Sequence, residues 1–217
     1  FLSGGIDSTI IALLAKKYNK NIEAYTSFFT PRDKFSKFIV DLTSIVDIFK
    51  DRVELEKTTI SNRSTKAFTL NGISDATLHL FGITKTRKLT KDEEAVAKEF
   101  WELVSKCIPE WNLLLEGKIA SADLRKEFVH GNTNTLNALG IVGRILIREY
   151  PEEWKQKLKG LRNMNWSRTN SQWEGRLLLN GRMLKNAIGV ELAANTILQN
   201  CGVQLPEDRI KHEKKNG

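Results

Sequence analysis

Apolar residues recur at three- and four-residue spacing in segment after segment of this chain. That spacing places them on one side of an α-helix, whereas a half-buried β-strand needs strict alternation. The clearest stripe comprises Phe35, Phe38, Ile39, Leu42, Ile45, Val46 and Phe49. The pattern predicts a mainly α fold of the α+β class, a helix-rich globular domain with few strands.

Helix boundary signals support this prediction. Thr90, followed three residues later by Glu93, fits a capping box that opens a strong apolar stripe. Pro109 ends that stripe, because proline cannot continue a helix without losing a hydrogen bond. The sequence therefore predicts a well-defined helix between these two signals.

Two later helices are predicted over residues 132–149 and 186–199. We expect Gly140 and Gly143 to loosen the first of them, since glycine is a weak helix former. From Pro206 onwards the tail is highly charged, and we expect it to be frayed.

The composition suits one ordinary globular domain: 217 residues, 41% hydrophobic and 28% charged. Charges interrupt every apolar stretch, so no membrane association is expected. Cys107 and Cys201 form no CxxC pair, and such sparse cysteine suits the cytoplasm, with both thiols acting as buried filler. His79, His130 and His212 lack ligand-like spacing, so no metal site is predicted.

Positive charge is concentrated late in the chain. The formal net charge is +8, and between Trp154 and Lys185 there are eight basic residues against one acid, Glu174. A local excess of this kind favours a polyanionic partner such as nucleic acid. We therefore expect DNA as a partner, contacted through this stretch.

Two polar segments contain candidate phosphate contacts. In Ser61–Lys66, hydroxyl and amide side chains alternate with Arg63 and Lys66, which can hold phosphate oxygens. The alternative is a structural loop in which Arg63 pairs with a carboxylate.

The second segment runs from Trp166 to Arg176, with two tryptophans flanking a run of hydrogen-bond donors. Trp166 and Trp173 can stack on exposed bases, or they can belong to the core while the arginines form internal ion pairs. The candidate phosphate contacts in and after this segment are Arg168, Asn170, Arg176, Arg182 and Lys185.

The front of the chain carries a different motif, in which a short strand, a glycine-rich turn and a helix follow one another. Glycines let the backbone approach an anion, and the helix directs its N-terminal amides at the same point. Residues 1–29 resemble the PP-loop of ATP pyrophosphatases, most closely the synthetase domain of asparagine synthetases. That resemblance implies ATP binding by Ser3, Gly4, Gly5, Asp7 and Ser8.

The PP-loop resemblance covers too little of a parallel sheet to build a complete site. We therefore expect at most a vestigial ATP site, no other cofactor, and no enzyme activity from this fragment by itself. An adenylating ligase remains an alternative function for the chain.

Residues 31–210 resemble another family, DndB, whose members are also called DGQHR-domain proteins. The similarity lies in two blocks, PRDKFSKFIVDLTSIVDIFKDRVELEKTTISNRSTKAFTLNGISDATLHLFG and LRNMNWSRTNSQWEGRLLLNGRMLKNAIGVELAANTILQNCGV. The Asp-Gly-Gln-His-Arg motif that names the family is absent, which puts any chemistry dependent on it in doubt.

The DndB resemblance implies a DNA-associated regulator in a bacterial DNA phosphorothioation system, where sulfur replaces a non-bridging backbone oxygen. It implies DNA and other proteins of that system as partners, and a protein-interaction scaffold is a further alternative. The predicted organisation is a PP-loop fragment over residues 1–30, a helical domain over 31–210 and a charged tail over 211–217.

Overall fold

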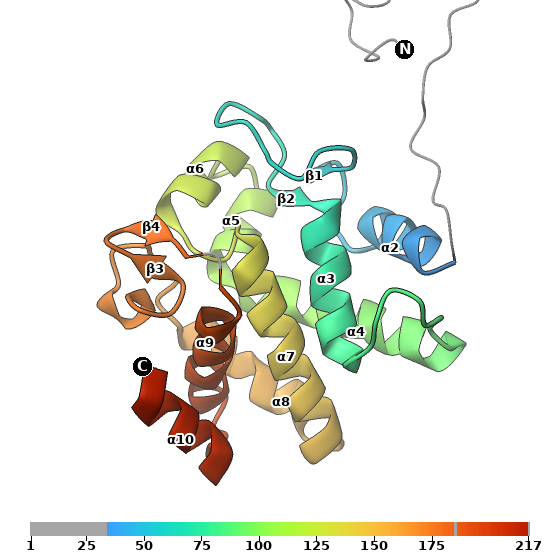
Figure 1. The fold of residues 1–217 in the computed structure, drawn as a ribbon. Helices are drawn as coiled ribbons and strands as arrows, with labels where there is room; N and C mark the ends of the chain where they lie inside the picture. Colours follow the sequence, from blue (N-terminus) through green and yellow to red (C-terminus); the bar gives the residue numbers. More distant parts are fainter. Residues whose placement is uncertain (1–33, 185, 217) are drawn as a thin grey trace, which may run out of the picture. The chain divides into compact units, whose positions relative to one another are not determined.

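Helices dominate the architecture, as the apolar spacing predicts (Figure 1). The computed structural model describes residues 34–184 and 186–216, which lie in the second of two structural units, residues 32–217. The helices are α2 (Lys34–Ile45), α3 (Leu70–Phe81), α4 (Lys91–Cys107), α5 (Pro109–Leu115), α6 (Ser121–Glu127), α7 (Thr133–Glu149), α8 (Trp154–Leu158), α9 (Ala187–Asn200) and α10 (Glu207–Asn216). Short 3-10 turns cover Lys159–Asn163 and Ser171–Trp173.

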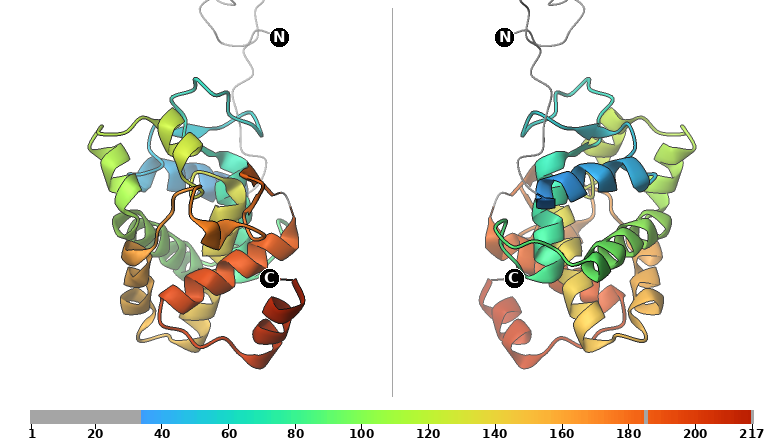
Figure 2. Two further views of the ribbon diagram at one scale, coloured as in Figure 1. Left: turned by 90° about the vertical axis from the view of Figure 1, so that its left-hand side faces the viewer. Right: turned by 90° about the vertical axis from the view of Figure 1, so that its right-hand side faces the viewer.

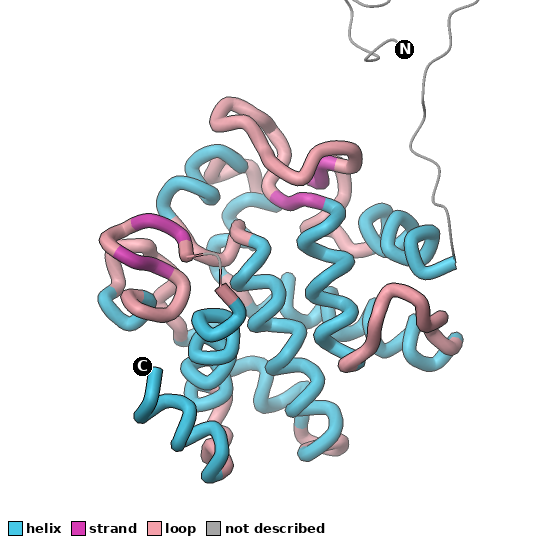
Figure 3. Tube along the Cα trace, viewed as in Figure 1, coloured by secondary structure: helices cyan, strands magenta, loops and turns pink. Residues whose placement is uncertain are grey.

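The strands of the described part of the chain are two residues long each (Figure 3). They are β1 (Val53–Glu54), β2 (Phe68–Thr69), β3 (Leu178–Leu179) and β4 (Arg182–Met183). β1 and β2 pair in parallel, whereas β3 and β4 form an antiparallel hairpin. Asn180 and Gly181 turn this hairpin with φ values of 51° and 72°, as an Asn-Gly turn requires.

Helix α7 lies between α3 and α9, and the three helices begin on the same side of the domain (Figures 1 and 2). The remaining helices surround this trio. The arrangement brings three helix N-termini together, which determines where polar backbone groups gather.

The glycines of α7 tighten its packing, contrary to the expectation that they loosen the helix. A Cβ atom at Gly140 would lie 2.1 Å from the carbonyl oxygen of Ala76, and one at Gly143 would lie 2.5 Å from Leu80 and from Phe100. The helix is continuous through both positions. Glycine is needed there because α3 and α7 approach too closely for any side chain, and the packing outweighs the intrinsic helix propensity.

An aromatic cluster fills the core beneath these helices. Rings that contact one another within it belong to Phe49, Phe68, Phe100, Trp101, Trp111, Phe128, His130, Trp166 and Trp173. Most pairs meet edge to face, which is the geometry that aromatic quadrupoles favour. The cluster joins elements far apart in sequence, from the end of α2 to the turn before β3.

Several predicted helix boundaries are confirmed. Thr90 and Glu93 form a capping box at the start of α4, and Pro109 opens α5 directly after α4 ends. The charged tail differs from the expectation, because residues after Pro206 form α10 and pack on α9. Among the described residues, no helix is both long and apolar enough to cross a membrane.

Candidate nucleic-acid interface

A cavity of about 650 Å³ lies where α3, α7 and α9 begin. Its wall contains the N-cap residue of each helix, which are Thr69, Asn132 and Asn186. Each cap side chain accepts a hydrogen bond from a first-turn backbone N–H group, at 3.1, 3.0 and 2.6 Å respectively. The positive ends of three helix dipoles therefore face one cavity, an arrangement that favours an anion.

The loop before β2 closes one side of this cavity. Thr58, Thr59 and Ile60 line the cavity, and the following residues 61–66 are fastened by Arg125 of α6. The Arg125 guanidinium donates to the carbonyl oxygens of Ser61, Asn62, Ser64 and Lys66. Sequence reasoning missed Arg125, because nothing local links it to a loop about sixty positions earlier.

This fastening changes how the predicted contacts of the loop can act. Since its carbonyl groups face Arg125, the loop presents side chains to solvent, not a backbone cradle for phosphate. The Arg63 side chain is exposed, whereas Lys66 is half-buried and donates to the carbonyl oxygen of Asp51 at 3.0 Å. Arg63 forms no ion pair with a carboxylate of the described residues, so its charge remains available.

The β3–β4 hairpin directly precedes the cavity residues Asn186 and Ala187 in the chain. The carbonyl oxygen of Leu184, just after the hairpin, accepts a hydrogen bond from the cavity residue Asn134. Arg182 is exposed on β4, and Arg168 donates to the carbonyl oxygen of Gly181 at 3.2 Å. Lys185, a predicted contact, lies outside the described residues.

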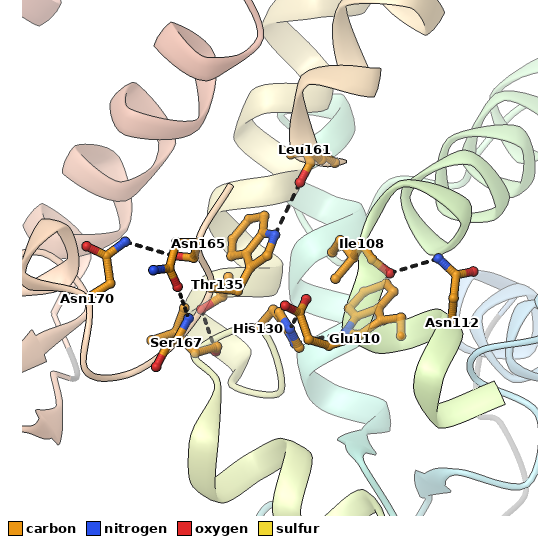
Figure 4. Close-up of polar contacts among 12 residues, drawn as sticks. Ile108, Glu110, Asn112, His130, Thr135, Leu161, Asn165, Ser167 and Asn170 are labelled. Carbon is orange, nitrogen blue, oxygen red and sulfur yellow. Dashed lines mark hydrogen bonds and ion pairs between the residues drawn. The ribbon is translucent and has the colours of Figure 1, made fainter. Parts of the chain in front are cut away.

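Asn170 has a structural role in the turn that precedes the hairpin. Its side chain donates to the carbonyl oxygen of Asn165 at 2.9 Å (Figure 4). It also accepts from the backbone N–H of Gln172 at 3.1 Å. Both functions of the amide are therefore used within the turn.

Both tryptophans of the predicted segment belong to the core. Trp166 and Trp173 are fully buried and stack on each other with centroids 5.4 Å apart. Their indole N–H groups donate to the carbonyl oxygens of Leu161 and Asn165. Of the two interpretations left open by the sequence, the described structure matches burial, and neither ring is exposed for stacking on a base.

Arg176 also forms an internal ion pair, which is the second of the two interpretations. Its two terminal nitrogens each lie 2.8 Å from an oxygen of Glu213, and one of them also donates to the carbonyl oxygen of Leu192 at 3.0 Å. Glu174, the one acid of the basic stretch, accepts from the backbone N–H of Asn180. The Glu213 carboxylate of α10 thus binds the Arg176 guanidinium, where a phosphate group was expected.

The basic segment is consequently divided between two ends of the domain. Lys155, Lys157 and Lys159 belong to α8 and the turn after it, near the C-terminal end of α7, where they contact Glu99, Glu153 and Gln156 (Figure 1). Arg182 lies on the hairpin that precedes the cavity residue Asn186, and Arg168 is bonded to the turn of that hairpin. The contiguous charge in the sequence does not form one surface.

His130 is the most enclosed titratable side chain near the cavity, and it is fully buried beside Trp111 and Glu110 (Figure 4). The Trp111 indole N–H donates to Nδ1 at 3.0 Å, and Nε2 lies 3.2 Å from a Glu110 oxygen. Because an indole only donates, Nδ1 must be unprotonated and Nε2–H donates to Glu110. Burial lowers the pKa of His130 despite the nearby carboxylate, so the ring is neutral and structural.

Neither thiol has the environment of a reactive cysteine. Cys107 and Cys201 are both buried, as predicted, and burial raises the pKa of Cys201 to about 12. No group of three or more metal-ligating side chains occurs among residues 34–184 and 186–216. The predicted ATP contacts, Ser3, Gly4, Gly5, Asp7 and Ser8, lie outside the described residues.

Comparison with known proteins gives one match. No curated protein and no solved structure matches the chain. A family model described as DndB, DNA-sulfur modification-associated, matches residues 9–204. The match begins inside the segment that resembles a PP-loop and extends through the cavity and the hairpin. The chain belongs to the DndB family of proteins associated with DNA sulfur modification.

Proposed function

We propose that this protein is a DNA-associated regulatory module of a DNA sulfur modification system, and that it binds backbone phosphates at the cavity. The observation that carries this proposal is the convergence of three helix N-termini at one cavity, with exposed arginines on the loop after Ile60 and on the hairpin before Asn186. Membership of the DndB family supports DNA as the polyanion.

Electrostatics explains why this end of the domain suits phosphate. First-turn N–H groups of α3, α7 and α9 point towards the cavity end, and the N-caps satisfy only part of them. Arg63 adds a full charge on the loop that follows the cavity residue Ile60, Arg182 adds one on the hairpin, and Arg168 adds a third beside the hairpin. Contacts of this kind position a protein on DNA without reading its sequence.

A salt titration tests the proposal. Binding of a fluorescent DNA duplex should weaken as salt rises, because phosphate neutralisation releases counterions. Arg63→Ala and Arg182→Ala should each weaken binding across sequences and reduce the slope of log K against log salt by about 1.

Arg148→Ala is the matched control. Arg148 is exposed in the last turn of α7, at the opposite end of that helix from the cavity. The Arg148→Ala substitution removes one positive charge, as the other two variants do, but it leaves the cavity end of the domain unchanged. Equal losses for all three variants, or no binding by the wild-type chain at low salt, would overturn the proposal.

A protein-interaction role has separate support. Leu179 and Ile188, on the hairpin and at the start of α9, are 53% and 48% exposed. Exposed apolar side chains beside a charged rim fit contact with another protein of the modification system. Leu179→Ser should then weaken that contact in a reconstituted system while DNA affinity stays unchanged.

An ATP-dependent ligase activity makes a different prediction. It requires pyrophosphate release from ATP that depends on the front glycines, so Gly4→Ala and Gly5→Ala should abolish it. Absence of pyrophosphate release by the wild-type chain, with DNA binding intact, would leave the regulatory proposal alone.

A further inference from the structure

Helix α10 attaches to the domain in an unusual way, because it lacks an apolar face. None of its described side chains is fully buried, and its one aliphatic side chain, Ile210, is 41% exposed. Helices in proteins usually owe their stability to burial of an apolar stripe, and a helix of this length is marginal alone. Something other than hydrophobic burial must hold α10 on α9.

Helix α10 lies beside α9 (Figures 1 and 2), and polar side chains provide the attachment. Glu213 forms the two-pronged ion pair with Arg176 and accepts a further bond from the buried Asn195 at 2.9 Å. Arg209 pairs with Glu191 at 3.0 Å and also donates to Asn195. These charge-assisted bonds join α10 to α9 and to the turn before the hairpin, and salt and competing anions act on such bonds directly.

Arg176 is held ready for an anion independently of α10. Its bond to the carbonyl oxygen of Leu192 fixes the guanidinium against α9. Its own carbonyl oxygen lies so close to Gly189 that a Cβ atom there would be 2.0 Å away, which anchors the backbone at the start of α9. A planar guanidinium fixed in this way accepts a carboxylate or a phosphate with the same two-pronged geometry.

The same contacts connect α10 to the cavity. Glu191, the partner of Arg209, lines the cavity together with Ala187 and Val190 of α9. The carbonyl oxygen of Arg176 also lies against Gly189, which stands between the cavity residues Ala187 and Val190.

We propose that Arg176 is a phosphate-binding residue that Glu213 occupies in the free protein, so that α10 acts as an internal competitor of DNA. This inference rests on the proposed function. DNA binding at the cavity would bring a backbone phosphate to Arg176, displace Glu213 and release α10. The free protein would bind DNA more weakly than its full set of cations allows.

Glu213→Gln tests the competition, with Glu207→Gln as its matched control. Both variants remove one negative charge from α10, but Glu207 is exposed and its ion pair with Lys211 spans the long distance of 3.7 Å. Glu213→Gln should tighten binding of a DNA duplex by roughly fivefold or more, the lower range of coupling between sites. Glu207→Gln should change it by less than about twofold, the effect of one exposed charge.

The double variant Arg176→Ala/Glu213→Gln identifies the residue that gains the phosphate. The tighter DNA binding of Glu213→Gln should disappear in the double variant, because the Arg176 guanidinium that Glu213 covers is then absent. Equal affinities of Glu213→Gln and Glu207→Gln would overturn the inference while leaving the proposed function intact, provided that the wild-type chain binds DNA.

Hydrogen exchange on the wild-type chain gives a readout that does not depend on any variant folding. Amides of residues 207–216 should exchange faster in the DNA complex than in the free protein, while those of α7 should not. Slower or unchanged exchange in α10 on binding would contradict its release. If no variant and no wild-type chain binds DNA, both proposals fail together.

Discussion

Helices α7 and α10 both pack on α9, but they are held in the domain by opposite means. Helix α7 is held by shape, since its glycines allow backbone contact with α3 and its apolar side chains are buried. Helix α10 is held by charge, through Arg209 and Glu213, with no buried side chain among its described residues. Contacts of the first kind change little with solution conditions, whereas those of the second kind respond to salt, pH and competing anions.

A substitution in the buried aromatic cluster should have the largest effect on the free energy of unfolding. Trp166→Ala removes a fully buried indole from the aromatic cluster and should reduce the free energy of unfolding by about 3–5 kcal/mol. Chemical denaturation checks this. A variant of unchanged stability with weakened DNA binding would instead support the exposed-stacking interpretation of this tryptophan.

A smaller loss is expected from Gly140→Ala. The added methyl group meets the Ala76 carbonyl oxygen at 2.1 Å, so α3 and α7 must separate, at a cost of about 1–3 kcal/mol. Arg148→Ala in the same helix is exposed and should stay within about 0.5 kcal/mol of wild type. If Gly140→Ala were stabilising, glycine would be a propensity defect in α7, as the sequence first suggested.

Acid should release α10 from the domain before it affects α7. The expected loss of stability is smaller than in the two preceding predictions. Burial disfavours the charged form of Glu213, but the bonds from Arg176 and Asn195 outweigh it and hold its pKa below the ordinary value. A carboxylate with a lowered pKa stabilises the fold above its ordinary pKa, and this stabilisation is lost as pH falls through the lowered value. Helix α10 should therefore remain docked at neutral pH and open in acid.

The measurement is amide exchange in α10 relative to α7 across an acid titration, since both helices share the intrinsic pH dependence of exchange. The ratio should rise roughly fivefold, equivalent to about 1 kcal/mol for a partly exposed ion pair. Glu213→Gln should remove the dependence. A ratio that stays constant in the wild-type chain would show that α10 is not held by this carboxylate.

Local signals in the sequence predicted the helices well. The capping box at Thr90 and the spacing of apolar residues act within one or two helical turns, so they can be recognised without knowing the fold. The hairpin was missed although its signal is local, since Asn180-Gly181 between apolar residues is a strong turn pattern.

The site was less predictable, because its determinants are far apart in the chain. Arg176 and Glu213 are separated by 37 positions, so charge counting within residues 154–185 could not reveal their pairing. The glycines of α7 are explained only by their contacts with α3. The exposed arginines of the predicted set, Arg63 and Arg182, stay predictions as DNA contacts.

The fastening of the loop by Arg125 has a consequence for the order of folding. This one side chain closes a contact over 64 positions, from α6 back to Ser61. Contacts between such distant residues form late, because chain entropy opposes them until the intervening helices have docked. The wall of the cavity should therefore be completed at the end of folding, and an immature chain would lack the pocket even when its helices have already formed.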